Sequence, residues 1–149
     1  MEPSIILEPF AGPGWREMVA LRDRLLRAPL GLAFDAEQLA AEAGQLHLAL
    51  RLGPVLAGTL LLLPPSPDGE AKLRQMAIDP ALQKRGLGTM LLRRGEAELR
   101  ERGAARVRLA ARDSAVGFYG RLGYVVDGAP FIEVTLPHRT MRKDLQPDP

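Results

Sequence analysis

The chain has 149 residues, of which 46% are hydrophobic and 26% charged, and its formal net charge is only +2. This composition excludes an intrinsically disordered chain and predicts one globular domain over residues 1–149, long enough to bury a core. The absence of cysteine excludes a disulfide framework, a thiolate nucleophile and cysteine-ligated metal sites.

The first half of the chain is typical of one strand, two helices and a β-hairpin. From Trp15 the apolar residues recur at helical spacing until Pro29, and Asp35 suits the N-cap of a second helix. Gly53 and Pro54 separate two apolar stretches, which indicates a tight hairpin. The expected elements are a strand at 4–8, a helix from 15, a helix at 36–43, and strands at 45–52 and 55–63.

A third strand is expected at 71–78, where side chains should alternate between the two faces of the sheet. One face would carry Leu73, Gln75 and Ala77, and the other Arg74, Met76 and Ile78. After a loop at 79–86, a helix to about residue 102 should have a leucine-rich inner side and a charged outer face. The remaining expected elements are strands at 106–112, 124–127 and 131–136 and a short helix at 113–122.

The order of these elements is β-α-α-β-β-β-α-β-α-β-β. A strand, a long helix and a strand in succession predict a parallel pair, whereas the hairpins on either side are antiparallel. The sequence therefore predicts an α/β (α+β) fold with a mixed central sheet of about six to seven strands, flanked by about four helices.

Several functional classes are unfavourable. Two widely separated histidines and no G-x-S-x-G segment disfavour a serine hydrolase or a His-rich metalloenzyme, and no metal site is expected. Basic residues are interleaved with acids rather than gathered in one stripe, which disfavours nucleic-acid binding. The longest apolar run, residues 58–64, is far shorter than the roughly 20 residues of a membrane helix. We expect a cytoplasmic protein with neither nucleic-acid nor membrane partners.

Gly86 and Gly88 open a helix soon after a strand, where unpaired backbone N–H groups and the helix dipole favour an anion. Lys84 and Arg85 add positive charge beside them. A Walker A loop would need Lys after the glycine, and a dinucleotide fingerprint would need a small residue at Leu91. Both motifs fail, which leaves a pyrophosphate-binding loop of another kind or an ordinary glycine-rich helix start.

The pattern Gln83-x-x-Gly86-x-Gly88 resembles the Q/R-x-x-G-x-G/A signature of the GCN5-related N-acetyltransferases (GNAT). A second segment is similar to the A-x-x-F-Y-x-x-x-G-F/Y segment of that family, with Ala115, Phe118, Tyr119, Gly123 and Tyr124 in register. Residues 131–141 and 29–32 also resemble the ElaA-like branch of predicted acyltransferases. The order of elements is that of the family over most of the chain.

The resemblance implies acetyl-CoA as co-substrate. Its pantetheine would bond the backbone of the cofactor strand at Met76, Ala77 and Ile78, where one N–H could also polarise the thioester carbonyl. Its pyrophosphate would bind the loop and helix start at Gln83, Lys84, Arg85, Gly86, Leu87, Gly88 and Thr89. Position 112 is often Asn in the family but is Arg112 here, which puts the amide contact in doubt and suggests a phosphate contact instead.

By the same resemblance, Tyr119 would protonate the departing CoA thiolate, and the alternative is an aromatic anchor for the short helix. The general base is less well indicated. Glu133 and His138 are candidates for relaying a proton from the amine, and the alternatives are a surface glutamate and a structural strand-end histidine. We expect His47 to be structural.

The sequence thus predicts an N-acetyltransferase that moves an acetyl group from acetyl-CoA to a primary amine by direct attack in a ternary complex. The alternative is a non-catalytic CoA-binding or regulatory module with the same fold. The acceptor could be a polyamine, an amino acid, an antibiotic or a protein amine. A homodimer is compatible with the resemblance.

Overall fold

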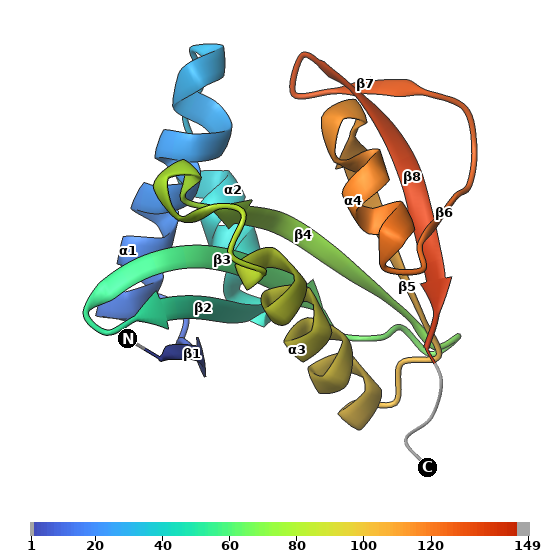
Figure 1. Cartoon of the computed structure of the whole chain (residues 1–149), viewed down its shortest axis with the longest axis horizontal. Helices are drawn as coiled ribbons and strands as arrows, with labels where there is room; N and C mark the ends of the chain where they lie inside the picture. The colour runs from blue at the N-terminus through green and yellow to red at the C-terminus, as the bar shows by residue number, and fades with distance from the viewer. Residues whose placement is uncertain (1, 146–149) are drawn as a thin grey trace.

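The computed structural model describes residues 2–145, whose strands form one mixed eight-stranded sheet in the order β1-β2-β3-β4-β5-β8-β6, with β7 paired to β8 (Figure 1). Only β4 and β5 are parallel, and every other neighbouring pair is antiparallel. The strands are β1 (Pro3–Leu7), β2 (Leu46–Leu52), β3 (Val55–Leu63), β4 (Glu70–Ile78), β5 (Arg106–Arg112), β6 (Val125–Val126), β7 (Phe131–Glu133) and β8 (Leu136–Asp144). The predicted mixed α/β fold is confirmed.

Four α-helices flank the sheet: α1 (Pro13–Arg22), α2 (Ala36–Ala40), α3 (Leu87–Glu101) and α4 (Val116–Arg121). The first helix does not continue regularly to Pro29 as expected, because a π-helical turn occupies Asp23–Arg27 and a 3₁₀ turn follows at Ala28–Leu30. Short 3₁₀ turns also lie at Ala41–Gly44, Pro80–Leu82 and Asp113–Ala115. None of the helices within residues 2–145 has the length and apolarity needed to cross a membrane.

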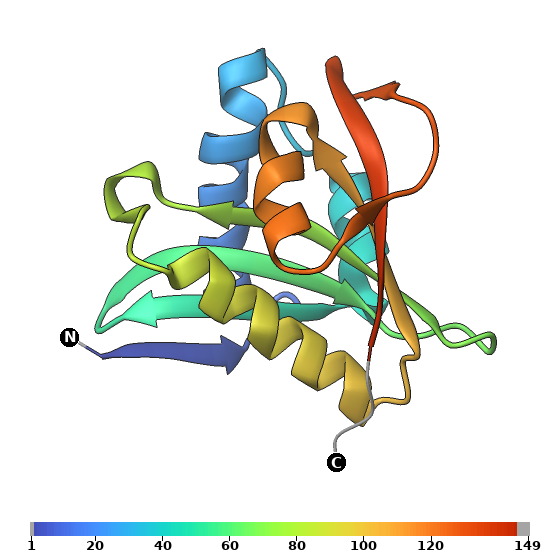
Figure 2. The same cartoon turned by 45° about the vertical axis from the view of Figure 1, so that its right-hand side comes forward.

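Helices cover both faces of the sheet, as strand alternation requires (Figure 2). On β3, Leu60 and Leu62 belong to the main core under α3, whereas Leu61 packs with Met18 of α1 on the opposite face. All of these side chains are essentially inaccessible to solvent. Burying them supplies the hydrophobic free energy that fixes the helices to the sheet.

The outer face of α3 carries exposed charges as predicted, among them Arg93 and Arg94, but Glu96 of the same helix is fully buried. It accepts bonds from Tyr124 Oη at 2.8 Å and Lys143 Nζ at 3.0 Å. The expected strand at 131–136 is broken by Val134 and Thr135, which have positive φ angles of 50° and 64° and turn the chain into β8. The sheet therefore has one strand more than the highest predicted number.

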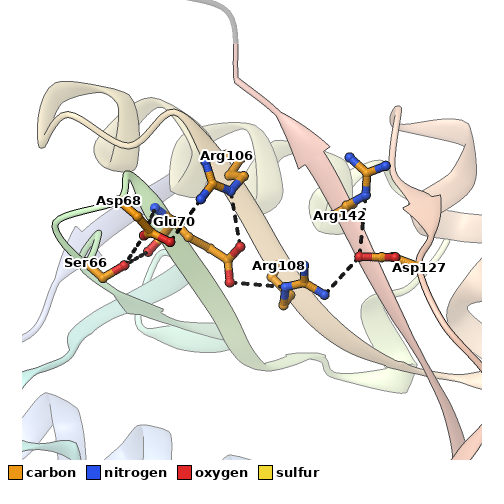
Figure 3. Close-up of polar contacts among 7 residues, drawn as sticks. All are labelled: Ser66, Asp68, Glu70, Arg106, Arg108, Asp127 and Arg142. Carbon is orange, nitrogen blue, oxygen red and sulfur yellow. Dashed lines mark hydrogen bonds and ion pairs between the residues drawn. The ribbon is translucent and has the colours of Figure 1, made fainter.

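A chain of ion pairs joins the strands at one end of the β4–β5 pair (Figure 3). Glu70 of β4 accepts from Arg106 at 3.2 Å and from Arg108 at 3.1 Å, and Arg108 continues to Asp127 at 3.1 Å. Asp127 also pairs with Arg142 of β8 at 3.5 Å. These contacts, with Asp68 and Ser66 on the preceding loop, hold together the only end at which β4 and β5 are paired.

Candidate active site

The parallel strands β4 and β5 separate soon after they begin. They are paired only at Glu70–Lys72 and Arg106–Arg108, and beyond this point the two strands diverge, with α4 beside the opening (Figures 1 and 2). The β5-facing edge of β4 is therefore left without a strand partner from Leu73 to Ile78. Backbone polar groups on such an edge need partners, so the opening suits a ligand that carries amides.

An irregularity in β4 sits at this opening. Thr59 pairs with Ala77 and Leu61 with Arg74, so two residues of β4 oppose one of β3, and Gln75 has a positive φ of 57°. This is a β-bulge, stabilised by a bond from Thr59 Oγ1 to the Gln75 carbonyl oxygen at 3.1 Å. The predicted alternation is wrong beyond Gln75, because Met76 and Ile78 pack on the core that also contains Leu73.

The first glycine of the motif is required by backbone conformation. Gly86 caps α3 with a left-handed φ of 74°, and no atom lies within 4 Å of the position its Cβ would take. Gly88 is instead close to its neighbours, since a Cβ there would lie 3.4 Å from both Met76 and Phe118. The space beside Gly86 is therefore open at the first turn of α3, where backbone N–H groups lack intrahelical partners.

A groove of about 610 Å³ runs from this turn to the opening of the sheet. Of the expected cofactor residues it is lined by Met76, Ala77, Ile78, Gln83, Lys84, Gly86, Leu87, Gly88 and Thr89. Gln83 Nε2 donates to the Ile78 carbonyl at 3.2 Å, which ties the loop to the end of β4. The lining includes residues that the sequence did not single out for this site: Leu82, Ser114, Ala115, Phe118 and Arg121.

Two expected cofactor residues lie elsewhere. Arg85 points to a separate surface hollow beside Val55 and Met90. Arg112 lines a second cavity on the far side of the opening, where its Nη2 donates to the Leu26 carbonyl at 3.0 Å. Both residues are therefore outside the groove, and a phosphate contact from Arg112 is not supported.

The second cavity, called here the basic cavity, holds about 140 Å³ and is formed by β4, β5, the π-helical turn and the β7–β8 turn. Its charged lining residues are Arg27, Arg74, Arg112 and Glu133, and His138 lines it as well. Burial, followed by the nearby charges of Arg112, Arg22 and Arg74, lowers the pKa of Arg27. The cavity thus concentrates guanidinium groups from three separate segments.

Tyr119 lies at the boundary of the two spaces, since it lines both the groove and the basic cavity together with Met76 and Ala115. Its hydroxyl is 3.6 Å from Met76 Sδ, and its ring contacts those of Phe118 and Tyr124 edge-on at 5.1 and 5.7 Å between centroids. Burial raises the pKa of Tyr119 to about 12, so the phenol keeps its proton at neutral pH.

His138 and Glu133 are neighbours on the basic cavity. His138 is buried and stacks on Phe131 at 5.8 Å, and its Nδ1 lies 2.8 Å from the Leu136 carbonyl oxygen. Because a carbonyl only accepts, Nδ1 carries the proton and Nε2 has the free lone pair in the neutral ring. Glu133 Oε2 is 3.9 Å from Nε2, where it can stabilise a proton taken up there.

His47 and Trp15 lie away from both spaces. His47 Nε2 donates to the Glu42 carbonyl at 3.0 Å, and burial lowers the pKa of this imidazole. Glu42 also accepts from Trp15 at 3.3 Å and from the fully buried Arg22 at 3.0 Å. This network holds α1 to the turn that precedes β2. Within residues 2–145, no group of three acidic or His side chains could hold a metal ion.

A sequence profile described as the acetyltransferase (GNAT) family matches residues 15–124, which include the groove, the glycine turn and Tyr119. The chain belongs to the GNAT acetyltransferase family. One curated relative of this GNAT protein is YyaT of Bacillus subtilis, 33% identical over 75 residues. That match spans 50% of this chain and about half, 51%, of the length of YyaT.

Solved GNAT-type structures superimpose over nearly the whole chain. A Lactobacillus plantarum protein assigned as an N-acetyltransferase has a TM-score of 0.81 and 27% identity, covering 97% of this chain and 99% of its own. Escherichia coli ElaA has a TM-score of 0.78 and 16% sequence identity, covering 96% of this chain and 99% of its own. An aminoglycoside 6'-N-acetyltransferase complexed with coenzyme A has a TM-score of 0.79 and 18% sequence identity, covering 98% of this chain and 99% of its own. The last two show a shared fold.

Proposed function

We propose that this GNAT protein is an acetyl-CoA-dependent N-acetyltransferase that acts on a primary amine in a ternary complex. The observation that carries the proposal is the position of Tyr119 between two spaces that meet only at Tyr119, Met76 and Ala115. One space has the features of a cofactor groove, and the other can admit an acceptor from the opposite side. Direct transfer between two bound molecules requires such an arrangement.

The groove suits CoA through its backbone groups. The open helix start at Gly86 can bind pyrophosphate oxygens, and the unpaired edge of β4 at Met76–Ile78 can bond amides and a carbonyl oxygen. Lys84 adds a positive charge to the same groove. Acetyl-CoA would supply the activated acyl group as a thioester.

Two side chains have suitable positions for proton transfer. Tyr119 remains protonated at neutral pH and can donate its proton to a leaving thiolate. His138 Nε2 has a free lone pair beside Glu133 and can receive the proton of the attacking amine, directly or through water. No hydrogen bond links His138 to Tyr119 among the described residues, so the two can act on different atoms.

Calorimetric titration with acetyl-CoA, followed by a thiol-release assay over a panel of amines, tests the proposal. We expect binding and amine-dependent release of CoA. Binding without release from any amine would indicate the non-catalytic module, and no binding would contradict both functions. Sedimentation of the same sample tests the homodimer, which stays a prediction.

A further inference from the structure

The basic cavity has an unusual balance of charge. Three guanidinium groups line it, from Arg27, Arg74 and Arg112, whereas Glu133 is its only carboxylate. The adjoining outer hollow adds Lys72 with no further acid in its lining, and it also includes Arg108, which is already paired with Glu70 and Asp127. An approaching amine therefore meets a positive surface.

The three arginines of the cavity also lack acidic partners. Across residues 2–145, Arg27, Arg74 and Arg112 form no ion pair, in contrast to the arginines that join β4, β5 and β8 in Figure 3. Arg27 and Arg112 are held in place by the Leu26 carbonyl, at 3.2 and 3.0 Å. Glu133 can offset only one of these three positive charges, and a bound anion would relieve the repulsion that remains.

The cluster is separated from the groove. None of the three arginines lines the space assigned to CoA, which has Lys84 and Arg121 as its own cations. The cluster instead surrounds the side of Tyr119 from which an acceptor would enter. Its counterion should accordingly belong to the acceptor.

We propose that the acceptor is an amine that carries a carboxylate, as an amino acid does, and that Arg27, Arg74 and Arg112 bind this carboxylate. The inference rests on the proposed N-acetyltransferase function and specifies its substrate class. Guanidinium groups can bind a carboxylate with two parallel hydrogen bonds, which would orient the amine toward Tyr119. A polycationic acceptor such as a polyamine is disfavoured by the same charges.

The cluster serves the chemistry as well as binding. Only a neutral amine can attack a thioester, and neighbouring positive charges disfavour the ammonium form. His138 and Glu133 lie on the same cavity to take up the released proton. An acceptor bound through its carboxylate would thus present a deprotonated amine at this site.

The test uses the full chain, acetyl-CoA and matched pairs of acceptors: phenylalanine with phenethylamine, lysine with cadaverine, and β-alanine with ethylamine. We expect kcat/KM to be at least about 30-fold higher for the carboxylate-bearing member of at least one pair. Arg74→Gln should lower that ratio about tenfold or more by raising the acceptor KM, while KM for acetyl-CoA stays unchanged. Arg74→Lys should recover part of the preference.

Arg16→Gln is the matched control, because Arg16 is exposed, lies outside both spaces and has no ion pair among the described residues. It should leave every ratio unchanged. Turnover of amines without preference for a carboxylate would overturn the inference but leave the N-acetyltransferase function intact. A preference for succinyl-CoA that is lost in Arg74→Gln would also overturn it, since the cluster would then bind the acyl group. Acetyl-CoA binding without turnover of any amine would instead contradict the proposed function.

Discussion

The groove and the basic cavity lie on either side of Tyr119, but the first is formed mainly by backbone groups and the second by side chains. The groove uses an unpaired strand edge, a helix start and two glycines, whereas the cavity uses charged side chains from segments far apart in the sequence. Backbone groups are fixed by the fold and tolerate many sequences, but a side-chain cluster changes with single substitutions. This contrast suggests that the fold determines which cofactor binds, whereas the side chains of this particular sequence determine which acceptor binds.

The largest expected effect concerns the boundary between the two spaces. Tyr119→Phe should lower kcat about 100-fold or more, because it removes the proton donor but keeps the ring contacts with Phe118 and Tyr124. The affinity for acetyl-CoA, measured by calorimetry, should stay the same. Full turnover by the folded variant would reduce Tyr119 to an aromatic anchor.

The matched control for this substitution is Tyr124→Phe. Tyr124 is buried, and its hydroxyl donates to Glu96 rather than facing either space. Losing this bond should cost about 1–3 kcal/mol of unfolding free energy with kcat preserved. Denaturant unfolding and the thiol-release assay together separate the two roles.

The groove can be tested through its glycine cap. Gly86→Ala places a Cβ on a left-handed residue, at a cost of about 1–2 kcal/mol, and should raise the dissociation constant of CoA about tenfold. Gly44→Ala is a suitable control because Gly44 has no positive φ and open space around it. If Gly86→Ala bound CoA with unchanged affinity, the helix start would not be the phosphate site.

The burial of Tyr119 between the two spaces predicts a distinctive pH dependence. The chain has two tyrosines, and burial raises the pKa of both, that of Tyr119 to about 12. At pH 10 a fully solvated phenol is about half ionised, so the unfolded chain should show phenolate absorbance where the folded chain does not. Since the folded pKa is raised, the stability due to Tyr119 persists below pH 10 and is lost between pH 10 and about 12.

An ultraviolet titration of folded and denatured protein measures this difference. Tyr119→Phe leaves Tyr124 as the single phenol and allows the two to be assigned. A phenolate transition near pH 10 in the folded chain would mean that the Tyr119 phenol is solvated, which would contradict the burial that raises its pKa.

The smallest effect on stability is expected at the end where β4 and β5 are paired. Glu70→Gln removes the carboxylate that joins Arg106 to Arg108 and should lower the unfolding free energy by less than about 1 kcal/mol, because these pairs are partly exposed. The loss should shrink further at high salt. Denaturant unfolding at two ionic strengths checks this, and a loss that grows with salt would contradict an ionic origin.

The sequence was most informative where structure follows from local rules. The strand, glycine turn and helix around Gly86 could be located from the sequence. A left-handed cap favours glycine whatever the rest of the fold, so the residue type itself marks the start of the helix. The bulge at Gln75 could not, since an ordinary residue adopts positive φ there only through its pairing with β3. The Val134–Thr135 turn was also missed, because β-branched residues rarely occupy such positions.

Long-range contacts account for the remaining differences. Glu96 follows Leu92 and precedes Leu99 at helical spacing, a signal of burial that could have been recognised, but its partner Lys143 lies on the last strand. Arg27 and Arg112 meet only because the π-helical turn folds over the end of β5. Such clusters depend on the whole fold and have no signature in a single segment.

The short pairing of β4 with β5 has a consequence for amide hydrogen exchange. Lys72 is paired with strands on both sides, whereas the β4 residues from Leu73 to Ile78 have partners only on β3. Deuterium should therefore enter the amides of Leu73–Ile78 that point to the open edge faster than the amide of Lys72. Acetyl-CoA bound along that edge should slow this exchange. The exchange rates of β4 amides with and without acetyl-CoA would then report both strand pairing and ligand binding.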